Sequence, residues 1–509
     1  MNAHRAPALV LLVALLVGAL SLGVEAPDGV GDATPAVART AMSLAGESSD
    51  LWFCIGPTSE LDGIRDRSVQ VASIAARPVD GRVIVVDDRG RAVERAFRLD
   101  AGDRLEIRPG RFVPGAAFAA VTVEVPGGAV VVSQRVEGDG VDQRPCLTRT
   151  SGTWLVPWST TARPGNRVWL LLHNPFPASA VIDLRFVGDI GRRETLDSQG
   201  MVVGGRSMVA YDVTERISDS SVVSALVHVR VGQVAAARLQ LANGDGPTGI
   251  RGLDLAPGLP EAGSRLFVPG VGPVPGSVAG STPGSAGDLS VVVLNPGEET
   301  IELEVVARTS PTDGFIEPWP VVLRAGQRHV VDLGDGRLDG VGTFGIEVRT
   351  LDGQLVAASL VRRGAVTGAQ RTGGNGQAAD DQPTHGGADV PDLAVRPLMA
   401  VAARGWLVDL GERFGSSGDI LAVVNPSGSS IATIEVKVLA GRAPEGLPVV
   451  VELDPGAQVV FPLGAGGPVT LAVESTSGVV ASVREWSPSG STAGVAVAVA
   501  GTEEWPESG

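Results

Sequence analysis

Three aspartates in one short segment are the residues whose type and spacing come closest to a metal site. Asp332, Asp335 and Asp339 lie close together in the chain, and Ca²⁺ prefers oxygen ligands such as carboxylates. The segment lacks the spacing of an EF-hand with its bidentate glutamate, and the corresponding segments elsewhere in the chain carry no similar set. An acidic turn therefore explains these residues better than a calcium site, and we predict no metal and no cofactor.

Serine and histidine form no recognisable catalytic pattern. A nucleophile elbow needs Gly-x-Ser-x-Gly between a strand and a helix, whereas Ser285 lies in a Gly- and Pro-rich stretch without a helical pattern after it. His173, His228 and His329 fall inside strand-like runs, and the chain contains no His-x-His or His-Glu-x-x-His spacing. We therefore predict no catalytic residues and a protein that is not an enzyme. An enzyme of unrecognised type, using dispersed acids, is the alternative.

The chain contains two cysteines, Cys54 and Cys146. In an exported protein an even number of cysteines predicts pairing, so we predict a structural disulfide between them. The closed loop would enclose almost the whole first module, and the chain-entropy estimate for such a loop is about 4–5 kcal/mol. Two free buried thiols are the alternative.

Aromatic and arginine side chains recur along the chain at similar places. An aromatic residue opens each of four segments, which favours a core position against an opposite sheet; these residues are Trp52, Trp154, Phe267 and Trp406. Other tryptophans have no equivalent in every segment and would stack on sugar rings if exposed; they are Trp158, Trp169, Trp319, Trp486 and Trp505. An arginine closes each segment, at Arg135, Arg238, Arg362 and Arg484. For these we expect an exposed strand residue that guards a sheet edge rather than a binding face.

These residues are carried by a pattern that repeats four times. An Asn-Pro pair ends one apolar run and opens the next at Asn174, Asn295 and Asn425, and Arg77-Pro78 stands at the matching place in the first repeat. Proline lacks an N–H and ends a strand. Each pair is followed by an alternating run, a Gly turn, and two further runs that predict a terminal hairpin. The repetition predicts duplicated modules.

Six or seven short strands per repeat predict an all-β fold, a tandem array of about four immunoglobulin-like β-sandwich modules after an N-terminal transmembrane or signal helix. A propeller blade, with about four strands in about 40–50 residues, is too small. Leu253-Asp254-Leu255 is a candidate extra edge strand. The expected boundaries are 1–25 for the signal peptide or membrane anchor, 26–49 for a spacer, 50–140, 150–244 and 264–364 for the first three modules, 365–392 for a flexible Gly-rich tether, and 393–501 for the fourth module.

The N-terminus predicts export. Residues 6–24 are almost unbroken apolar sequence behind His4 and Arg5, long enough nearly to span a bilayer core of about 30 Å, and the positive flank places the start in the cytoplasm. Val24-Glu25-Ala26 is an adequate cleavage site, but Pro27 would follow it, so a cleaved signal and an uncleaved anchor both stay open. The net charge of −16 argues against a nucleic-acid partner.

With its Asn-Pro turns, the opening Leu51-Trp52-Phe53-Cys54 and the exported topology, residues 50–490 resemble a family of unknown function. That family consists of exported, single-anchor proteins of high-GC Gram-positive bacteria, the actinobacteria. The resemblance implies no known activity and transfers no functional residues. We expect a non-enzymatic cell-envelope protein, structural or binding, whose partners are an envelope protein or a cell-wall glycan, with its oligomeric state open. A carbohydrate-binding or glycan-assembly accessory protein is the alternative.

Overall fold

The computed structural model of this protein describes residues 42–43, 49–127, 130–245, 250–272, 289–309, 314–363, 393–400, 402–411, 413–414, 419–487, 490–492 and 497–500. In this part of the chain no helix is long and apolar enough to cross a membrane. The expected signal peptide or anchor at 1–25, most of the spacer at 26–49 and the tether at 365–392 lie outside the described residues, so those predictions stay predictions.

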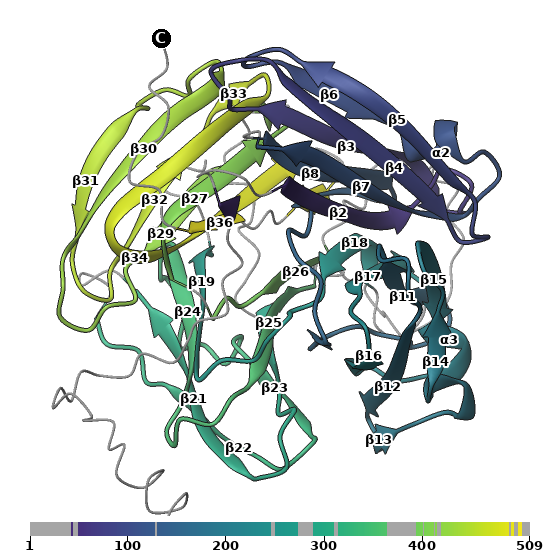
Figure 1. Cartoon of the computed structure of the whole chain (residues 1–509). Coiled ribbons are helices and arrows are strands. Elements are labelled where there is room, and N and C mark those ends of the chain that lie inside the picture. Colours follow the sequence, from purple (N-terminus) through teal and green to yellow (C-terminus); the bar gives the residue numbers. More distant parts are fainter. Residues whose placement is uncertain are drawn as a thin grey trace, which may run out of the picture. The chain divides into compact units, whose positions relative to one another are not determined.

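Apart from one parallel pair of short strands at 42–43 and 497–500, the described strands form antiparallel sheets, in which one pairing order occurs four times. Each repeat has eight strand positions, counted in chain order. Positions 1, 6, 3 and 4 lie side by side, in this order, in one sheet, and positions 5, 2, 7 and 8 lie side by side in the other. Figure 1 shows the repeats in succession from purple and blue through teal and green to yellow. We call these four repeats modules 1 to 4.

Module 1 contains β2 (Ser49–Pro57), β3 (Ile64–Ser73), β4 (Val79–Asp87), β5 (Ala92–Leu99), β6 (Arg104–Ile107), α2 (Pro109–Phe112), β7 (Phe118–Pro126), β8 (Val130–Gly138) and β9 (Gly140–Pro145). Module 2 contains β10 (Thr153–Val156), β11 (Asn166–Asn174), β12 (Ala180–Gly188), β13 (Gly191–Arg193), η1 (Leu196–Ser198), β14 (Met201–Val203), β15 (Ser207–Asp212), α3 (Val213–Arg216), β16 (Ser224–Val231), β17 (Ala235–Asn243) and β18 (Arg251–Pro257).

Module 3 contains β19 (Arg265–Val271), β20 (Leu289–Leu294), β21 (Ile301–Arg308), β22 (Trp319–Leu323), β23 (Arg328–Asp332), β24 (Phe344–Thr350), β25 (Ala357–Arg362) and β26 (Ala394–Pro397). Module 4 contains β27 (Ala403–Leu410), β28 (Arg413–Phe414), β29 (Ile420–Val424), β30 (Ala432–Gly441), β31 (Val449–Leu453), β32 (Gln458–Pro462), β33 (Ala465–Gly466), β34 (Val469–Ser487), β35 (Gly490–Thr492) and β36 (Val497–Ala500). β1 (Met42–Ser43) pairs with β36.

The eighth strand of modules 1, 2 and 3 lies beyond the ends that the sequence suggested. β9 continues to Pro145, although the expected first module ended at residue 140. β18 contains the candidate edge strand around Asp254 and pairs with β17, although the expected module ended at residue 244. β26 pairs with β25, although the expected third module ended at residue 364. Module 2 therefore gains β18 from what was predicted to be connecting sequence, and module 3 gains β26 from the range that was predicted to belong to the fourth module, 393–501.

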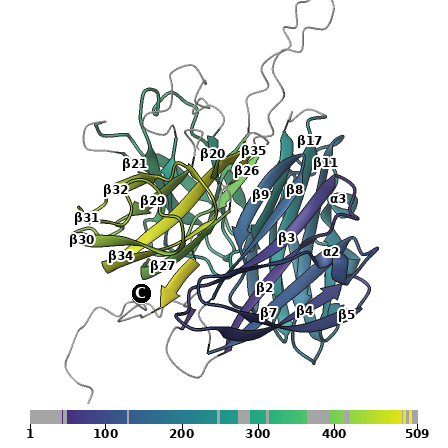
Figure 2. The ribbon, with the colours of Figure 1, turned by 90° about the horizontal axis from the view of Figure 1, so that it is seen from above.

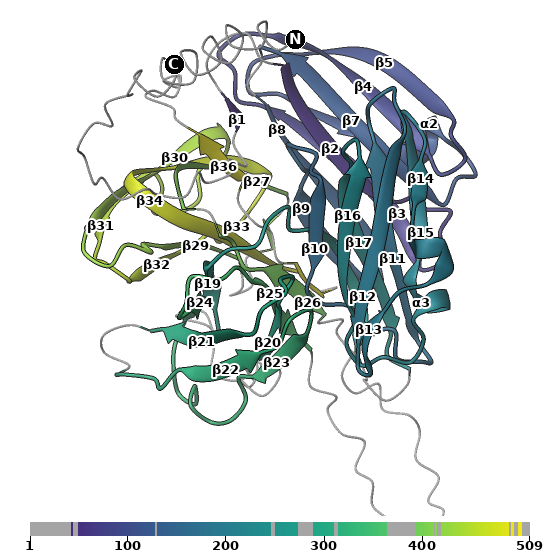
Figure 3. The same ribbon diagram turned by 60° about the horizontal axis from the view of Figure 1, so that its bottom comes forward.

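The predicted terminal hairpin is wrong, because its two strands belong to opposite sheets. β7 lies beside β2 and β4, whereas β8 lies beside β3 and β9. The turn between them reverses the chain across the core instead of along one sheet. In module 4 the predicted terminal hairpin is also wrong, because β34 is continuous and pairs first with β27 and β30 and then with β29. Figure 3 shows β34 running through this module.

The pairing order also differs from that of an immunoglobulin domain. In constant-type immunoglobulin sheets the first strand pairs with the second and the sixth with the seventh. Here the first strand pairs with the sixth, as β2 does with β7, and the second pairs with the seventh, as β3 does with β8. The all-β sandwich architecture is present, and the immunoglobulin-like identity is not shown by this order.

One large apolar residue of each first strand fills the core of its own module. The residues at this register position are Trp52, Trp154, Leu266 and Trp406, opposite Val123, Val227, Val348 and Val473. All four are buried. The Nε1 groups of Trp154 and Trp406 donate hydrogen bonds of 2.8 Å to the carbonyls of Val234 and Val479. Core positions were thus predicted correctly for the three tryptophans, while the third module uses Leu266 rather than Phe267.

The asparagine of each Asn-Pro pair ties the second strand to a neighbouring turn. Asn295 Nδ2 donates to the carbonyls of Glu299, Leu323 and Arg324, and its Oδ1 accepts from the backbone N–H of Gly297. Asn174 and Asn425 make the same kinds of bond. The side chain therefore satisfies backbone groups where the chain crosses between sheets.

Module 1 carries a serine at this position. By register, the equivalent of Asn295 is Ser73, because Ala72 pairs with Arg104 as Leu294 pairs with Arg328. The prediction that Arg77-Pro78 occupies the matching place is therefore wrong. The serine side chain is shorter than that of asparagine and does not make the equivalent bonds to backbone carbonyls. The Ser73 hydroxyl is buried without a hydrogen-bond partner among the described residues.

The residue after each core position of the first strand packs against the following module. Successive strand side chains point to opposite faces, so these residues leave their own core; they are Phe53, Leu155, Phe267 and Leu407. Phe53 packs with Trp169 and Leu171 of module 2, and Leu155 packs with Leu294 and Ala357 of module 3. Phe267 joins the core cluster of module 4, and Leu407 joins that of module 1. Each module therefore packs against the next one, and module 4 packs against module 1.

Candidate functional site

Cys54 on β2 and Cys146, directly after β9, are joined by a disulfide with 4.8 Å between their Cα atoms. Both cysteines are buried in the core of module 1. The bond links residues 92 positions apart, so it holds the beginning and the end of the module together.

Two of the aspartates in the candidate calcium segment, Asp332 and Asp335, accept hydrogen bonds from nearby groups of the protein. Asp332 accepts a hydrogen bond from the backbone N–H of Gly334, and Asp335 accepts from the backbone N–H of Arg337 and from Trp319 Nε1. Within the described ranges, no group of three or more His, Cys, Asp or Glu side chains is placed to hold a metal ion. Ser285 lies outside those ranges.

The tryptophans proposed as sugar-stacking platforms are buried wherever their side chains are described. Trp158, Trp169 and Trp319 are 1%, 7% and 6% exposed, which removes them as surface platforms. Trp169 packs against Phe118 of module 1, and Trp158 lies under the guanidinium of Arg238. The side chains of Trp486 and Trp505 lie outside the described residues.

The four closing arginines do not occupy equivalent positions. Val131, Ala235, Ala357 and Val480 are equivalent by register, and Arg238 follows this position by three residues, Arg135 and Arg484 by four, and Arg362 by five. A shift of one residue turns a side chain to the other face of the sheet. Arg238 is fully buried, whereas Arg362, two residues further along by register, is half-buried, so the prediction of an exposed edge residue is wrong for Arg238.

Arg238 belongs to a buried ion cluster that joins three modules. Arg144 on β9 donates to both oxygens of Asp142, to Asp254 Oδ2 at 2.9 Å and to the carbonyl of Val395 at 2.8 Å. Arg238 on β17 donates to Asp254 Oδ1. Asp254 Oδ2 also accepts from the backbone N–H of Val395 on β26. Figure 1 places β18 next to β26, and Figure 2 shows β9 beside β35.

The cluster is electrically balanced but sealed from water. Its two guanidinium and two carboxylate groups are each 4% exposed or less. Burial, followed by the negative charge of Asp254, raises the pKa of Asp142 to about 6, although Arg144 opposes this shift. Desolvation likewise lowers the pKa of Arg238. A buried network of this kind is costly to break once formed.

A second buried carboxylate joins module 4 back to module 1. Asp409 on β27 forms an ion pair of 2.8 Å with Arg104 and accepts hydrogen bonds from Ser133 and Thr470. Arg104 and Ser133 belong to module 1, and burial raises the pKa of Asp409 above its usual value. Polar contacts therefore accompany the apolar contact of Leu407 at this junction.

His173 lies at the junction between modules 1 and 2 as a neutral imidazole. Its Nδ1 donates to the carbonyl of Ser207, and its Nε2 accepts from the hydroxyl of Thr122 in module 1. The ring is buried beside Phe53. Desolvation by burial lowers the pKa of His173 from 6.5 to about 4.

Replacing His173 with glutamine should make the free energy of unfolding fall less steeply as the pH decreases from 6.5 to 4. Between pH 4 and 6.5 the unfolded chain binds more protons at this site than the folded chain, so the contribution is complete above pH 6.5 and is lost as the pH falls to about 4. The expected size is about 3 kcal/mol. Asp142 has a raised pKa, so below pH 6 the folded chain binds more protons at this site than the unfolded chain, and its contribution to the free energy of unfolding rises there as the pH falls. The free energy of unfolding in urea is therefore measured at pH 7.5 and 4.5 for the wild type and for H173Q. The histidine contribution is the amount by which the change between the two pH values is larger in the wild type.

The matched control is His329→Gln, because His329 lies on β23 with its side chain exposed. H329Q should leave the pH dependence of unfolding as in the wild type. Equal profiles for H173Q and wild type would contradict the assignment of a buried neutral histidine.

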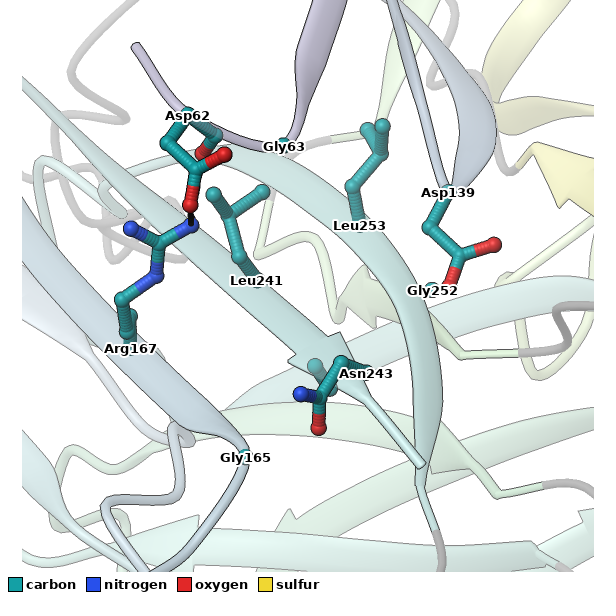
Figure 4. Close-up of a pocket in the computed structure, with 10 residues that line it drawn as sticks. Asp62, Gly63, Asp139, Gly165, Arg167, Leu241, Asn243, Gly252 and Leu253 are labelled. Atoms are coloured by element: carbon teal, nitrogen blue, oxygen red, sulfur yellow. Dashed lines mark hydrogen bonds and ion pairs between the residues drawn. The ribbon is translucent and has the colours of Figure 1, made fainter. Parts of the chain in front are cut away.

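A pocket of about 480 Å³ lies where loops of module 1 meet strand ends of module 2. Asp62 and Gly63 come from the β2–β3 loop and Asp139 from the β8–β9 turn; module 2 supplies Gly165, Arg167, Leu241, Ala242, Asn243, Gly252 and Leu253. Figure 4 shows Asp62 and Arg167 on one side and Asp139 on the other, with Leu241 and Leu253 between them.

The charged groups of this pocket are paired within the protein. Arg167 donates to the backbone carbonyl of Asp62 at 2.5 Å and lies 3.5 Å from its carboxylate. Asp139 forms an ion pair of 2.7 Å with Arg251. The arrangement offers carboxylate acceptors, a guanidinium donor and an amide around an apolar floor.

Neither the ion cluster nor the pocket was predicted from the sequence. The Asp142-x-Arg144 pair and the lone Asp254 inside an apolar strand were the available indications, because a charge inside an apolar run needs a buried partner. For the pocket, the indication was glycine at strand ends of both modules, at Gly63 and Gly252.

Comparison with known proteins gives one family. The model of a family of unknown function (DUF5719) matches residues 124–405. No curated protein matches the chain. Among solved structures, the chain is matched to a crystal structure of a tetra-tandem repeat in the extending region of a large adhesion protein, with 10% identity over 89% of this chain and 100% of that chain. The TM-score of 0.09 is too low to support any argument.

The family match begins in β7 of module 1 and ends in β27 of module 4. It therefore contains modules 2 and 3 entire, the ion cluster, and every pocket residue except Asp62 and Gly63. The matched residues make up more than half of the 509-residue chain, and the chain belongs to this family of unknown function.

Proposed function

We propose that the chain is a non-enzymatic protein of the cell envelope whose modules form a stiff platform for an envelope protein or a cell-wall glycan. The observation that carries this proposal is the closed series of module contacts made by Phe53, Leu155, Phe267 and Leu407. Modules packed on both neighbours present surfaces in fixed relation to one another. A pre-formed surface loses little conformational entropy when a partner binds.

The ionisable groups with shifted pKa values favour a structural role. Such groups often mark catalytic sites, although structural ion-pair networks shift pKa values as well. The side chains of Asp142, His173 and Asp409 are each buried and hydrogen-bonded across a module junction. Their charges and hydrogen bonds are therefore engaged in holding modules together.

Two features support placement outside the cytoplasm. Residues 6–24 form an apolar segment behind positive charge, and the Cys54–Cys146 disulfide is of a kind that persists in oxidising compartments. The proposed protein is either anchored to the cytoplasmic membrane or secreted, as in the exported actinobacterial proteins that the sequence resembles. A role based on exposed tryptophans loses support, because Trp158, Trp169 and Trp319 are buried.

Fractionation of cells that produce the full-length chain tests the proposal. We expect the chain in the envelope or the medium, with both cysteines blocked to alkylation until a reductant is added. Chemical crosslinking in intact envelopes should attach it to an envelope protein or a wall glycan. Recovery from the cytosol with two freely alkylated thiols would contradict export, and a chain that crosslinks to neither class of partner would contradict the platform role.

A further inference from the structure

We propose that the pocket between modules 1 and 2 binds one unit of a neutral, polyhydroxylated ligand, a sugar residue. The pocket volume of about 480 Å³ falls within the range of small-molecule sites, about 300–1,000 Å³, which occur preferentially at domain interfaces. This inference deepens the proposed function by naming a ligand class for a defined site. It depends on the proposed function only for the source of the sugar.

The balance of charge in the pocket selects a neutral ligand. Asp62 stands beside Arg167 in the lining, and Asp139 is paired with Arg251, which lies outside the lining, so each carboxylate already has an arginine partner and attracts a free cation weakly. A hydroxyl group can donate to a carboxylate and accept from a guanidinium at the same time. Several hydroxyls on one small ring therefore match the alternation of acceptors and donors along this rim.

The shape of the pocket fits a ring with one apolar face. Leu241 and Leu253 are both buried except for their contribution to the floor, and they provide a surface for ring C–H groups. Gly63, Gly165 and Gly252 have φ values of +90°, +98° and +135°, a conformation that other residues rarely adopt. The wall carries no side chains at these points, although at Gly165 the space that a Cβ would need is filled by Asn243 and Asp245.

Titration of the full-length protein with glucose, galactose, arabinose and N-acetylglucosamine, followed by saturation-transfer NMR and calorimetry, tests the assignment. At least one sugar should bind saturably. D139A should weaken that sugar about tenfold or more, because it removes a charged hydrogen-bond acceptor worth about 1.5–3 kcal/mol. D62A should weaken it less, because the Asp62 carboxylate is 94% exposed. The matched control is D80A, which removes an exposed carboxylate paired with Arg98 on module 1 and should bind as the wild type does.

Three results would overturn the assignment. The first is saturable binding of none of the four sugars, and the second is equal binding by D139A and wild type. The third is binding of sulfate or Ca²⁺ in the pocket, weakened by D62A or D139A, in place of a sugar. A failure here leaves fractionation and crosslinking unaffected, so loss of this assignment is distinguishable from loss of the proposed function.

Discussion

Replacing Asp254 with alanine should lower the free energy of unfolding by about 3–5 kcal/mol, the usual cost of removing one partner from a buried ion pair. Asp254 accepts from Arg144, Arg238 and the backbone of Val395, and its loss leaves two buried guanidinium groups with Asp142 alone. Three guanidinium nitrogens, Nη1 of Arg144 and Nε and Nη1 of Arg238, already have no hydrogen-bond partner among the described residues. The cluster therefore has no spare acceptor to replace the lost carboxylate.

The measurement is urea unfolding at neutral pH, with hydrogen exchange to locate the effect. Exchange should increase in β9, β18 and β26 together, since the cluster joins modules 1, 2 and 3, and should stay unchanged in β31 of module 4. The control D80A removes an exposed ion pair whose two side chains are 73% and 63% exposed, and it should cost about 1 kcal/mol or less. Equal costs for D254A and D80A would show that the cluster does not hold the modules together.

The buried ion cluster couples the duplicated modules to one another. Tandem modules joined by tethers would move independently, and their stabilities would be separate. Here Arg144 of module 1 contacts modules 2 and 3 in one network, and Asp409 of module 4 contacts Arg104 of module 1. A change at one junction is therefore expected to affect the neighbouring modules.

The strands and the core could be predicted from the sequence because their causes are local. Alternation of period two marks a half-buried strand, as in β22, where buried and exposed residues alternate. Trp52, Trp154 and Trp406 were placed correctly in cores because large aromatics in short strands are usually buried. The disulfide followed from the even number of cysteines and the predicted export.

Register and pairing could not be predicted, because they depend on contacts between distant segments. Phe267 was chosen over Leu266 for its aromatic ring, yet a shift of one residue turns a strand side chain to the other face, and Phe267 faces module 4. Glycine turns indicated reversals such as that between β7 and β8, but a turn does not specify which sheet receives the next strand. Asp254 alone gave no hint of Arg144, which lies in another module.

Loss of the Cys54–Cys146 disulfide should destabilise module 1 by about 4 kcal/mol as an upper estimate. A cross-link removes conformations from the unfolded chain, and the chain-entropy model gives about 3 kcal/mol for a 15-residue loop and about 4.7 kcal/mol for a 100-residue loop. The loop closed here spans 92 residues. We expect the double variant C54A/C146A to unfold at clearly lower urea concentration than the oxidised wild type.

The same chain under reducing conditions separates the cross-link from packing. Alanine also removes two buried sulfur atoms from the core of module 1, so C54A/C146A loses both contacts and the cross-link. Wild-type protein unfolded with a reductant loses the cross-link alone, and most of the effect should appear there, whereas the variant should not respond to reductant. The module contains Asp409's partners Arg104 and Ser133, so loosening it should also raise hydrogen exchange in β27. Equal unfolding of oxidised and reduced wild type would mean that packing across the four junctions, rather than the disulfide, determines the stability of module 1.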